Sequence, residues 1–367
     1  MRYSVTVLTP LLVGDGQKLS PIDYMVWKDH VNVLDQRRIF KLLAKGPRLD
    51  GYLAQLRKAD KLDFASWGGF AQNFAGRRIP FEHSTSSAYW DRASGESLHI
   101  PTFACAASGP YLPGAAIKGA LRTGMLFASL RDGSLRSVAQ RFQGERPPRR
   151  PAEGPEEQAL GGASSNKMRA LAVADSQPVA TQTMKVYLLR VSTLQARGPG
   201  EYSLAWKQSP RGAVDGRRPE DSTPAFAEMA APGAAFEGAW REKGVPERRR
   251  IFQGVNECAA QMLSLQQQYA KWTGLELLNR QIADLQGRLD ALDSGSACLL
   301  SLGWGGGLLT KTAWLGKDSE DHLQILRSLP LYSRALSTGL PFPKTRRIVF
   351  LENKPATLPG WVLLEVL

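Results

Sequence analysis

One segment of the chain combines glycine, small residues and two basic side chains in a spacing that suits phosphate groups. The run from 109 to 123 reads GPYLPGAAIKGALRT, and Pro113 is placed to open a helix because the first turn does not need its missing N–H. Free backbone N–H groups at a helix start attract anions, and Gly114 lets a phosphate backbone come close. Lys118 and Arg122 are four residues apart and share one helix face. They either clamp successive phosphates or form a solvated basic face.

A second segment, LGWGGGLLTKT at 302–312, has glycine at four of five successive positions, followed by Lys311. Such a loop can lie flat against a phosphate backbone, whereas the alternative is a tight connection between a helix and a strand. Trp304 suits either stacking on a base or burial beside the turn, and burial is the commoner role. The glycines that we expect to contact a phosphate backbone here are Gly303, Gly305, Gly306 and Gly307.

A third glycine turn lies near the N-terminus, in the sequence TPLLVGDG at 9–16. Gly14 and Gly16 make this turn flexible, and Lys18 supplies a basic side chain directly after it. Three separate segments therefore pair glycine turns with basic residues. This pattern predicts contacts to a phosphate backbone from all three.

Several kinds of enzyme site are not supported by the residue types and spacings. Three cysteines and four histidines stand alone, so we expect no metal, no disulfide framework and no cofactor; they are Cys105, Cys258, Cys298, His30, His83, His99 and His322. A P-loop is excluded because Ala120-Leu121 stands where that motif needs Lys and Ser or Thr. Asp15 and Asp23 can each position a metal-bound water or simply cap a turn, and we expect no catalytic residue.

The elements that must position these segments indicate an α+β protein with antiparallel sheets. Arg2–Leu8 alternates polar and apolar residues as a half-buried strand does, and Asp35 is a typical cap for a following helix. We predict a hairpin from 225–229 and 235–240. Apolar residues spaced three and four apart predict a long helical region at 252–292, which covers the protein's own sheet or, less often, a partner.

The overall charge indicates a polyanionic partner. The 367 residues carry 47 Lys and Arg against 34 Asp and Glu, which gives a formal net charge of +13. No run approaches the roughly 18 apolar residues that span a bilayer, and the N-terminal residues are typical of a strand rather than a signal peptide. Isolated cysteines fit a reducing compartment, so we expect a cytoplasmic protein without membrane contact.

These motifs, in this order, resemble those of RAMP proteins, the RNA-binding subunits of CRISPR effector complexes. Within that superfamily the chain most resembles the fifth Csm subunit of type III-A complexes. The resemblance rests on GDGQKLSPIDY at 14–24, VLD at 33–35, VADS at 173–176, the two glycine segments above and PGWV at 359–362. The intervals 60–100, 131–167 and 196–222 match nothing in that pattern.

The resemblance implies a ferredoxin-like (RRM-like) core, as one elaborated copy or two copies, divided into halves at 1–195 and 196–367. It implies a non-catalytic subunit that binds crRNA near its 3′ end, with target RNA nearby. The implied protein partners are the repeating Csm backbone subunit and the small helical Csm subunit. The alternatives are a metal-dependent endoribonuclease and a RAMP subunit of another type III complex. The sequence lacks an RNP1-type aromatic motif, which favours contacts to phosphate and sugar over base stacking.

Overall fold

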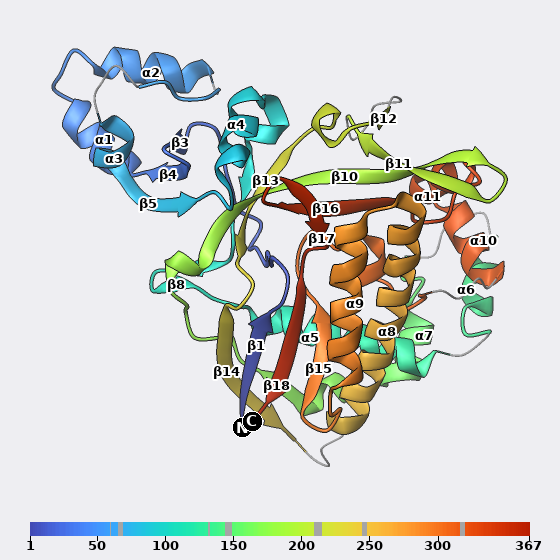
Figure 1. The fold of residues 1–367 in the computed structure, drawn as a ribbon. Helices are drawn as coiled ribbons and strands as arrows, with labels where there is room; N and C mark the ends of the chain where they lie inside the picture. Colours follow the sequence, from blue (N-terminus) through green and yellow to red (C-terminus); the bar gives the residue numbers. More distant parts are fainter. Residues whose placement is uncertain are drawn as a thin grey trace.

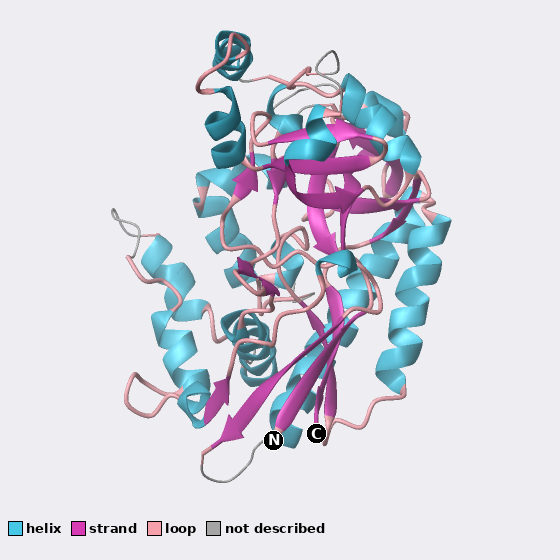
Figure 2. Cartoon of the chain, turned by 90° about the vertical axis from the view of Figure 1, so that its left-hand side faces the viewer, coloured by secondary structure: helices cyan, strands magenta, loops and turns pink. Residues whose placement is uncertain are grey.

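The computed structural model describes residues 1–58, 60–64, 69–130, 133–143, 149–208, 215–243, 248–315 and 320–367. Two antiparallel sheets lie one above the other, as Figure 1 and the turned view in Figure 2 show. Two helices, α8 (Arg248–Thr273) and α9 (Glu276–Asp290), run alongside both sheets. A smaller module projects from the upper sheet. No described helix has the length and apolar character needed to cross a bilayer.

The first sheet contains the ferredoxin-like core. Its spatial order is β15–β18–β1–β14–β9. The strands are β1 (Arg2–Val7), β9 (Leu171–Val173), β14 (Ala235–Glu242), β15 (Ala297–Ser301) and β18 (Trp361–Val366). With α5 (Gly114–Ser129) and α8, the sequence β1–α5–β9–β14–α8–β18 forms the βαββαβ unit, with strands in the spatial order fourth, first, third, second. Strand β15 is an added edge.

Burial explains why this core forms. Tyr3, Val5 and Val7 alternate along β1 and are all buried, which confirms the predicted half-buried strand. Helices α5 and α8 lie so close together that a Cβ at Gly124 would stand 2.5 Å from a methyl of Val255. Glycine at this position therefore allows the two helices to pack against each other on the sheet.

The second sheet is built differently. Its path is β12–β11–β10–β16–β17, and β13 also pairs with β10. The strands are β10 (Met184–Gly198), β11 (Glu201–Lys207), β12 (Asp215–Gly216), β13 (Ala225–Ala230), β16 (Thr345–Leu351) and β17 (Lys354–Thr357). Among the described residues this sheet does not repeat the βαββαβ order, so the described part of the chain contains that unit once. The proposed division between 195 and 196 falls inside β10, which both halves would share.

The predicted hairpin at 225–240 is wrong. Strand β13 pairs with β10 in the second sheet, whereas β14 pairs with β1 and β9 in the first. The short connection at 231–234 therefore carries the chain from one sheet to the other.

The long helical region is two helices, because Gly274 adopts a left-handed conformation with φ +67° between α8 and α9. The apolar stripe of α9 is covered by the protein itself, since Leu278, Ile282 and Leu285 are at most 2% exposed. This confirms the expectation that the helix lies on its own sheet.

The projecting module has its own small core, with Tyr52 and Phe64 at its centre. It contains β3 (Tyr24–Trp27), β4 (His30–Leu34), α1 (Gln36–Leu43), α2 (Leu49–Lys58), α3 (Phe70–Phe74) and β5 (Ala75–Pro80). Asp35 caps α1 by accepting a hydrogen bond from the Arg38 N–H at 3.0 Å, as predicted. Part of the interval 60–100, which matches nothing in the family pattern, is therefore ordered structure.

Shorter elements complete the described chain. They are β2 (Lys18–Leu19), α4 (Ser84–Arg92), η2 (Gly95–Leu98), β6 (Ile100–Pro101), β7 (Cys105–Ala106), β8 (Gly109–Pro110), α6 (Arg136–Phe142), α7 (Glu153–Leu160), η3 (Lys167–Ala170), η4 (Thr181–Thr183), η5 (Pro219–Asp221), η6 (Leu308–Thr310), α10 (Glu320–Ser328) and α11 (Pro330–Leu336).

Candidate nucleic-acid interface

Two of the three glycine segments meet at the junction between the sheets. The Trp304 N–H donates to the Leu12 carbonyl at 2.8 Å. Gly303 has φ +72°, and a Cβ there would overlap the same carbonyl oxygen. The loop that follows β15 is therefore fixed directly on the segment that follows β1, and only glycine fits at the contact.

The C-terminal PGWV sequence joins the same junction. The Gly360 N–H donates to the Pro10 carbonyl at 2.9 Å, and the Trp361 N–H donates to the Thr9 hydroxyl at 2.9 Å. Gly360 has φ +91°, and a Cβ there would overlap the Leu302 carbonyl oxygen. Three pieces that are far apart in the sequence thus form one packed unit at the ends of β1, β15 and β18.

A hollow of about 140 Å³ opens beside this unit. Three successive loop glycines form one side of it, and β16 forms another. The lining residues are Val191, Gly305, Gly306, Gly307, Leu308, Leu309, Pro343, Thr345, Arg346, Arg347 and Leu358. The glycine backbone, which has no side chains in the way, lies here beside a strand that carries arginine. This arrangement suits a phosphate group.

Arg347 is the most informative side chain of the hollow. Its guanidinium lies 4.0 Å from the centre of the Trp304 ring. Its Nε is buried and has no hydrogen-bond partner among the described residues. Burial also lowers the pKa of Arg347 from its ordinary value, because the charged form loses hydration. A cation in this position is stabilised by an anion that enters the hollow.

Arg346, the neighbouring lining arginine, has a structural role. It donates to the carbonyls of Pro343 and Thr345 at 2.6 and 2.9 Å, and its guanidinium lies 4.4 Å from the centre of the Tyr269 ring. Burial lowers its pKa to about 10. Because its Nε and Nη1 donors are already used inside the protein, it is a weaker candidate than Arg347 for an external phosphate.

The loop glycines differ in what surrounds them. A Cβ at Gly305 would lie 2.7 Å from the Pro359 ring, and a Cβ at Gly306 would lie 2.5 Å from the Thr310 hydroxyl. Gly307 has φ +73° and open space around it. Lys311 follows the short η6 helix; its side chain is exposed, while partial burial of its ammonium group lowers its pKa. Gly307 and Lys311 are therefore accessible to a ligand.

The two glycines of the N-terminal turn also differ in their surroundings. A Cβ at Gly14 would lie 2.8 Å from the Thr102 carbonyl oxygen, whereas Gly16, with φ +91°, faces open space. Lys18 is exposed at the start of β2. Asp15 accepts a hydrogen bond from the Gln17 N–H at 3.1 Å, which is ordinary turn chemistry.

The α5 segment lies apart from this site. The Gly114 N–H, expected to be free for an anion, donates to the Asp175 carboxylate at 2.8 Å, and a Cβ at Gly114 would overlap the Val173 carbonyl oxygen. Gly114 therefore allows the start of α5 to pack against the end of β9. The aspartate already occupies the donor on which the predicted anion site depended.

The predicted basic face of α5 points toward α7. Arg122 forms an ion pair with Glu156 at 2.5 Å, and Glu153 and Glu157 line the same surface depression. Lys118, four residues earlier, shares this face. Ala120 and Thr123, which line a small cavity with Thr310 of the glycine loop, lie on a different face of the helix. The phosphate clamp of Lys118 and Arg122 stays a prediction, in surroundings that carry negative charge.

The reading of the sequence missed Arg347. The signal available was a pair of arginines at the start of an otherwise apolar strand, TRRIVFL, where charged residues are seldom buried. Its position beside Trp304 follows only from the packing of β16 on the glycine loop.

The two carboxylates considered for metal chemistry both serve turns. Asp23 accepts from the Ser20 N–H at 2.7 Å and from the Ser20 hydroxyl at 2.6 Å, while Asp15 holds the turn described above. In the part of the chain that the structure describes, no three His, Cys, Asp or Glu side chains gather as a metal site requires.

Comparisons with known proteins agree with this geometry. A family model described as the RAMP superfamily matches residues 4–310. A chain of the cryo-EM structure of a Csm–crRNA–target RNA ternary complex from a type III-A CRISPR-Cas system is similar over 100% of both chains, with a TM-score of 0.69 and 21% identity. The crystal structure of Csm5 of T. onnurineus has a TM-score of 0.57 and 18% identity over 98% of this chain and 99% of that one. Curated protein sequences give no significant match.

Proposed function

The chain belongs to the RAMP superfamily, and we propose that it is a crRNA-binding subunit of a type III-A (Csm) CRISPR effector complex. The observation that carries this proposal is the hollow formed by Gly305–Gly307 and Arg347. It offers an unpartnered arginine donor beside bare backbone on a strongly basic chain. Such a site binds phosphate and sugar and is largely indifferent to base identity, as a guide-RNA carrier requires.

The fold supports a place among Csm subunits, since its likeness covers the full length of a chain in a Csm complex with bound RNA. We propose the crRNA 3′ end as its position, with target RNA nearby. The repeating backbone subunit and the small helical subunit are the proposed protein neighbours. The cytoplasm is the proposed location, where the three free thiols would stay reduced.

The Arg347 contact gives the direct test. Replacing Arg347 by Gln should weaken binding of crRNA about tenfold or more, because charge-assisted hydrogen bonds contribute about 1.5–3 kcal/mol. The slope of log affinity against log salt should fall by about 0.7, the value for one single-strand phosphate contact. Both quantities follow from filter binding or anisotropy at several salt concentrations, using the full chain and several guide sequences.

Arg122→Gln is the matched control. Because Glu156 already neutralises Arg122, we expect its substitution to change RNA affinity by less than about twofold. If the predicted clamp on α5 binds the RNA instead, Arg122→Gln should cause a large loss of RNA affinity and Arg347→Gln a small one. Thermal unfolding of both variants separates lost contacts from lost structure. An affinity unchanged in Arg347→Gln at an unchanged unfolding temperature would remove the support for the proposed site.

We also propose that this subunit does not cleave RNA. A complex that carries Asp23→Ala should still cut target RNA at every site, because Asp23 caps a turn through Ser20. Asp15→Ala, in the other turn, should behave in the same way. Denaturing gels of the cleavage products provide the measurement. Loss of one product band with either variant would assign a catalytic carboxylate to this chain.

A further inference from the structure

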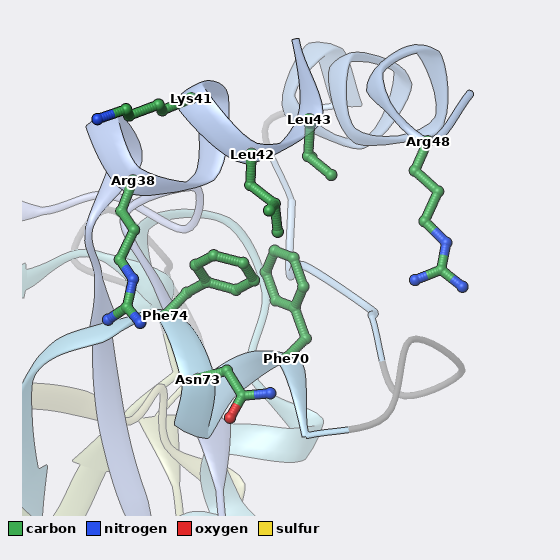
Figure 3. A pocket seen from close by; sticks show the side chains of 8 residues that line it. All are labelled: Arg38, Lys41, Leu42, Leu43, Arg48, Phe70, Asn73 and Phe74. Atoms are coloured by element: carbon green, nitrogen blue, oxygen red, sulfur yellow. The ribbon is translucent and has the colours of Figure 1, made fainter. Parts of the chain in front are cut away.

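The projecting module carries an open apolar groove beside helix α1, shown in Figure 3. We call it the α1 groove. Its volume is about 680 Å³, and it is lined by Arg38, Lys41, Leu42, Leu43, Arg48, Phe70, Asn73 and Phe74. The groove belongs to the module with its own core, apart from the glycine loop and the hollow beside it.

Helix α1 exposes more apolar surface than a solvated helix needs. Leu42 is 65% exposed and Phe40 is 40% exposed, although the helix has only eight residues. Among the described residues, the other large apolar side chains exposed to this degree are Met1, Leu367, Leu277 and Leu331, which do not adjoin one another in the sequence. Leu42 points over Phe70 in Figure 3, so its exposed methyl groups continue the apolar floor of the groove.

The rim of the groove is positively charged. Exposed basic residues stand on α1 and in the turn that follows it, namely Arg37, Arg38, Lys41, Lys45 and Arg48. No acidic residue lies between Asp35 and Asp50. A partner that covers the leucine must therefore place its own side chains among these cations, which favours a partner with carboxylates around an apolar stripe.

The lining favours a protein segment over RNA. A base needs a free aromatic face, yet Phe70 is only 4% exposed and Arg38 lies against the Phe74 ring, 5.9 Å from its centre. Leu42, the most exposed apolar side chain of the groove, offers nothing for a base to stack on. Aliphatic side chains spaced along a helix can pack on it.

From this apolar floor and basic rim we propose that the α1 groove docks an amphipathic helical segment of an acidic protein. The proposal does not depend on the RNA-binding proposal, because the two surfaces share no residue. It predicts that the Arg347→Gln variant keeps full affinity for such a segment.

The test uses the full chain and defined fluorescent peptides. One helical peptide of about 16 residues carries Leu at positions i, i+3, i+4 and i+7 and Glu elsewhere; a second has Lys in place of Glu, and a third has a scrambled order. We expect only the acidic amphipathic peptide to bind. Leu42→Ser should weaken its binding about tenfold, and Lys41→Glu should weaken it by a similar factor that shrinks at high salt.

Leu331→Ser is the matched control, since Leu331 is 78% exposed on α11 and lies outside the groove. It should leave peptide affinity unchanged. Equal binding of the Lys peptide, or equal losses from Leu42→Ser and Leu331→Ser, would overturn the proposal. So would absence of binding by the acidic peptide. Oligouridine should not displace the peptide. If it displaces the peptide from Leu42→Ser but no longer from Lys41→Glu, the surface would instead be assigned to nucleic acid.

Discussion

Replacing Gly303 by Ala should lower the free energy of unfolding by about 3 kcal/mol or more and abolish RNA binding at the glycine loop. Left-handed backbone costs about 1–2 kcal/mol for a residue with a Cβ. The larger effect comes from the overlap of that Cβ with the Leu12 carbonyl oxygen, which also accepts the Trp304 N–H. Relief requires the loop to move away from the segment after β1, and this movement breaks that hydrogen bond.

Gly307→Ala is the control that separates backbone strain from the overlap. Its φ of +73° is nearly the same, but a Cβ there meets no atom within 4 Å. Because φ +73° and ψ −160° together form a backbone conformation that is essentially restricted to glycine, we expect a loss of about 1–3 kcal/mol from backbone strain alone. Urea unfolding of both variants measures the difference. Similar losses for the two would mean that the loop adapts to a Cβ at 303 and is not fixed on Leu12.

Gly307→Ala also tests the loop as an RNA contact. Its Cβ would project into open space beside the hollow, where a phosphate backbone would have to approach. Weaker RNA binding in a variant that remains folded under the binding conditions supports a direct contact, whereas unchanged binding would leave Gly307 with a conformational role alone.

Sequence patterns correctly predicted those features that depend only on residues close together in the sequence. The alternation in β1 and the cap at Asp35 depend on neighbours within a few residues, and both are present. Partner choice is not local. The segments 225–229 and 235–240 have the spacing of a hairpin, yet each pairs with a strand from elsewhere in the chain. Their short connection is equally compatible with a turn and with a change of sheet.

The candidate site could also be predicted only in part. Glycine runs indicated where backbone must come close to something, but the sequence did not say whether that partner is RNA or the protein itself. For Gly303 and Gly114 it is the protein, since a Cβ at either position would overlap a carbonyl oxygen of the chain. Gly16 and Gly307 face open space. Arg347 becomes informative only when β16 is placed beside Trp304.

A buried ion pair joins the projecting module to the second sheet. Arg77 on β5 lies with Nη1 2.8 Å from Oε1 of Glu228 and Nη2 2.9 Å from Oε2, and Glu228 on β13 is fully buried. Burial raises the pKa of Glu228, while Arg77 opposes that rise. Among the groups that favour the charged form of this buried carboxylate, the arginine that reaches it from the module has the largest effect.

Arg77→Met should consequently lower the free energy of unfolding by about 3–5 kcal/mol at neutral pH, because it leaves a buried charge without its partner. The loss should diminish on acidification. A raised folded-state pKa means that the folded protein binds the proton more tightly, so stability falls as pH rises through that pKa and returns below it. Urea unfolding at pH 7.5 and at pH 5 measures both effects.

Arg78→Met is the matched control, since Arg78 is exposed on the adjacent position of β5 and donates to the Asn32 side chain at 3.2 Å. It should cost about 1–3 kcal/mol, because it leaves the oxygen of the buried Asn32 without its donor, and this cost should be the same at either pH. Adding Glu228→Gln to Arg77→Met should recover much of the lost stability, because an amide of similar shape carries no charge. Equal losses from Arg77→Met and Arg78→Met, or a loss that grows on acidification, would show that the pair does not hold the module on the sheet.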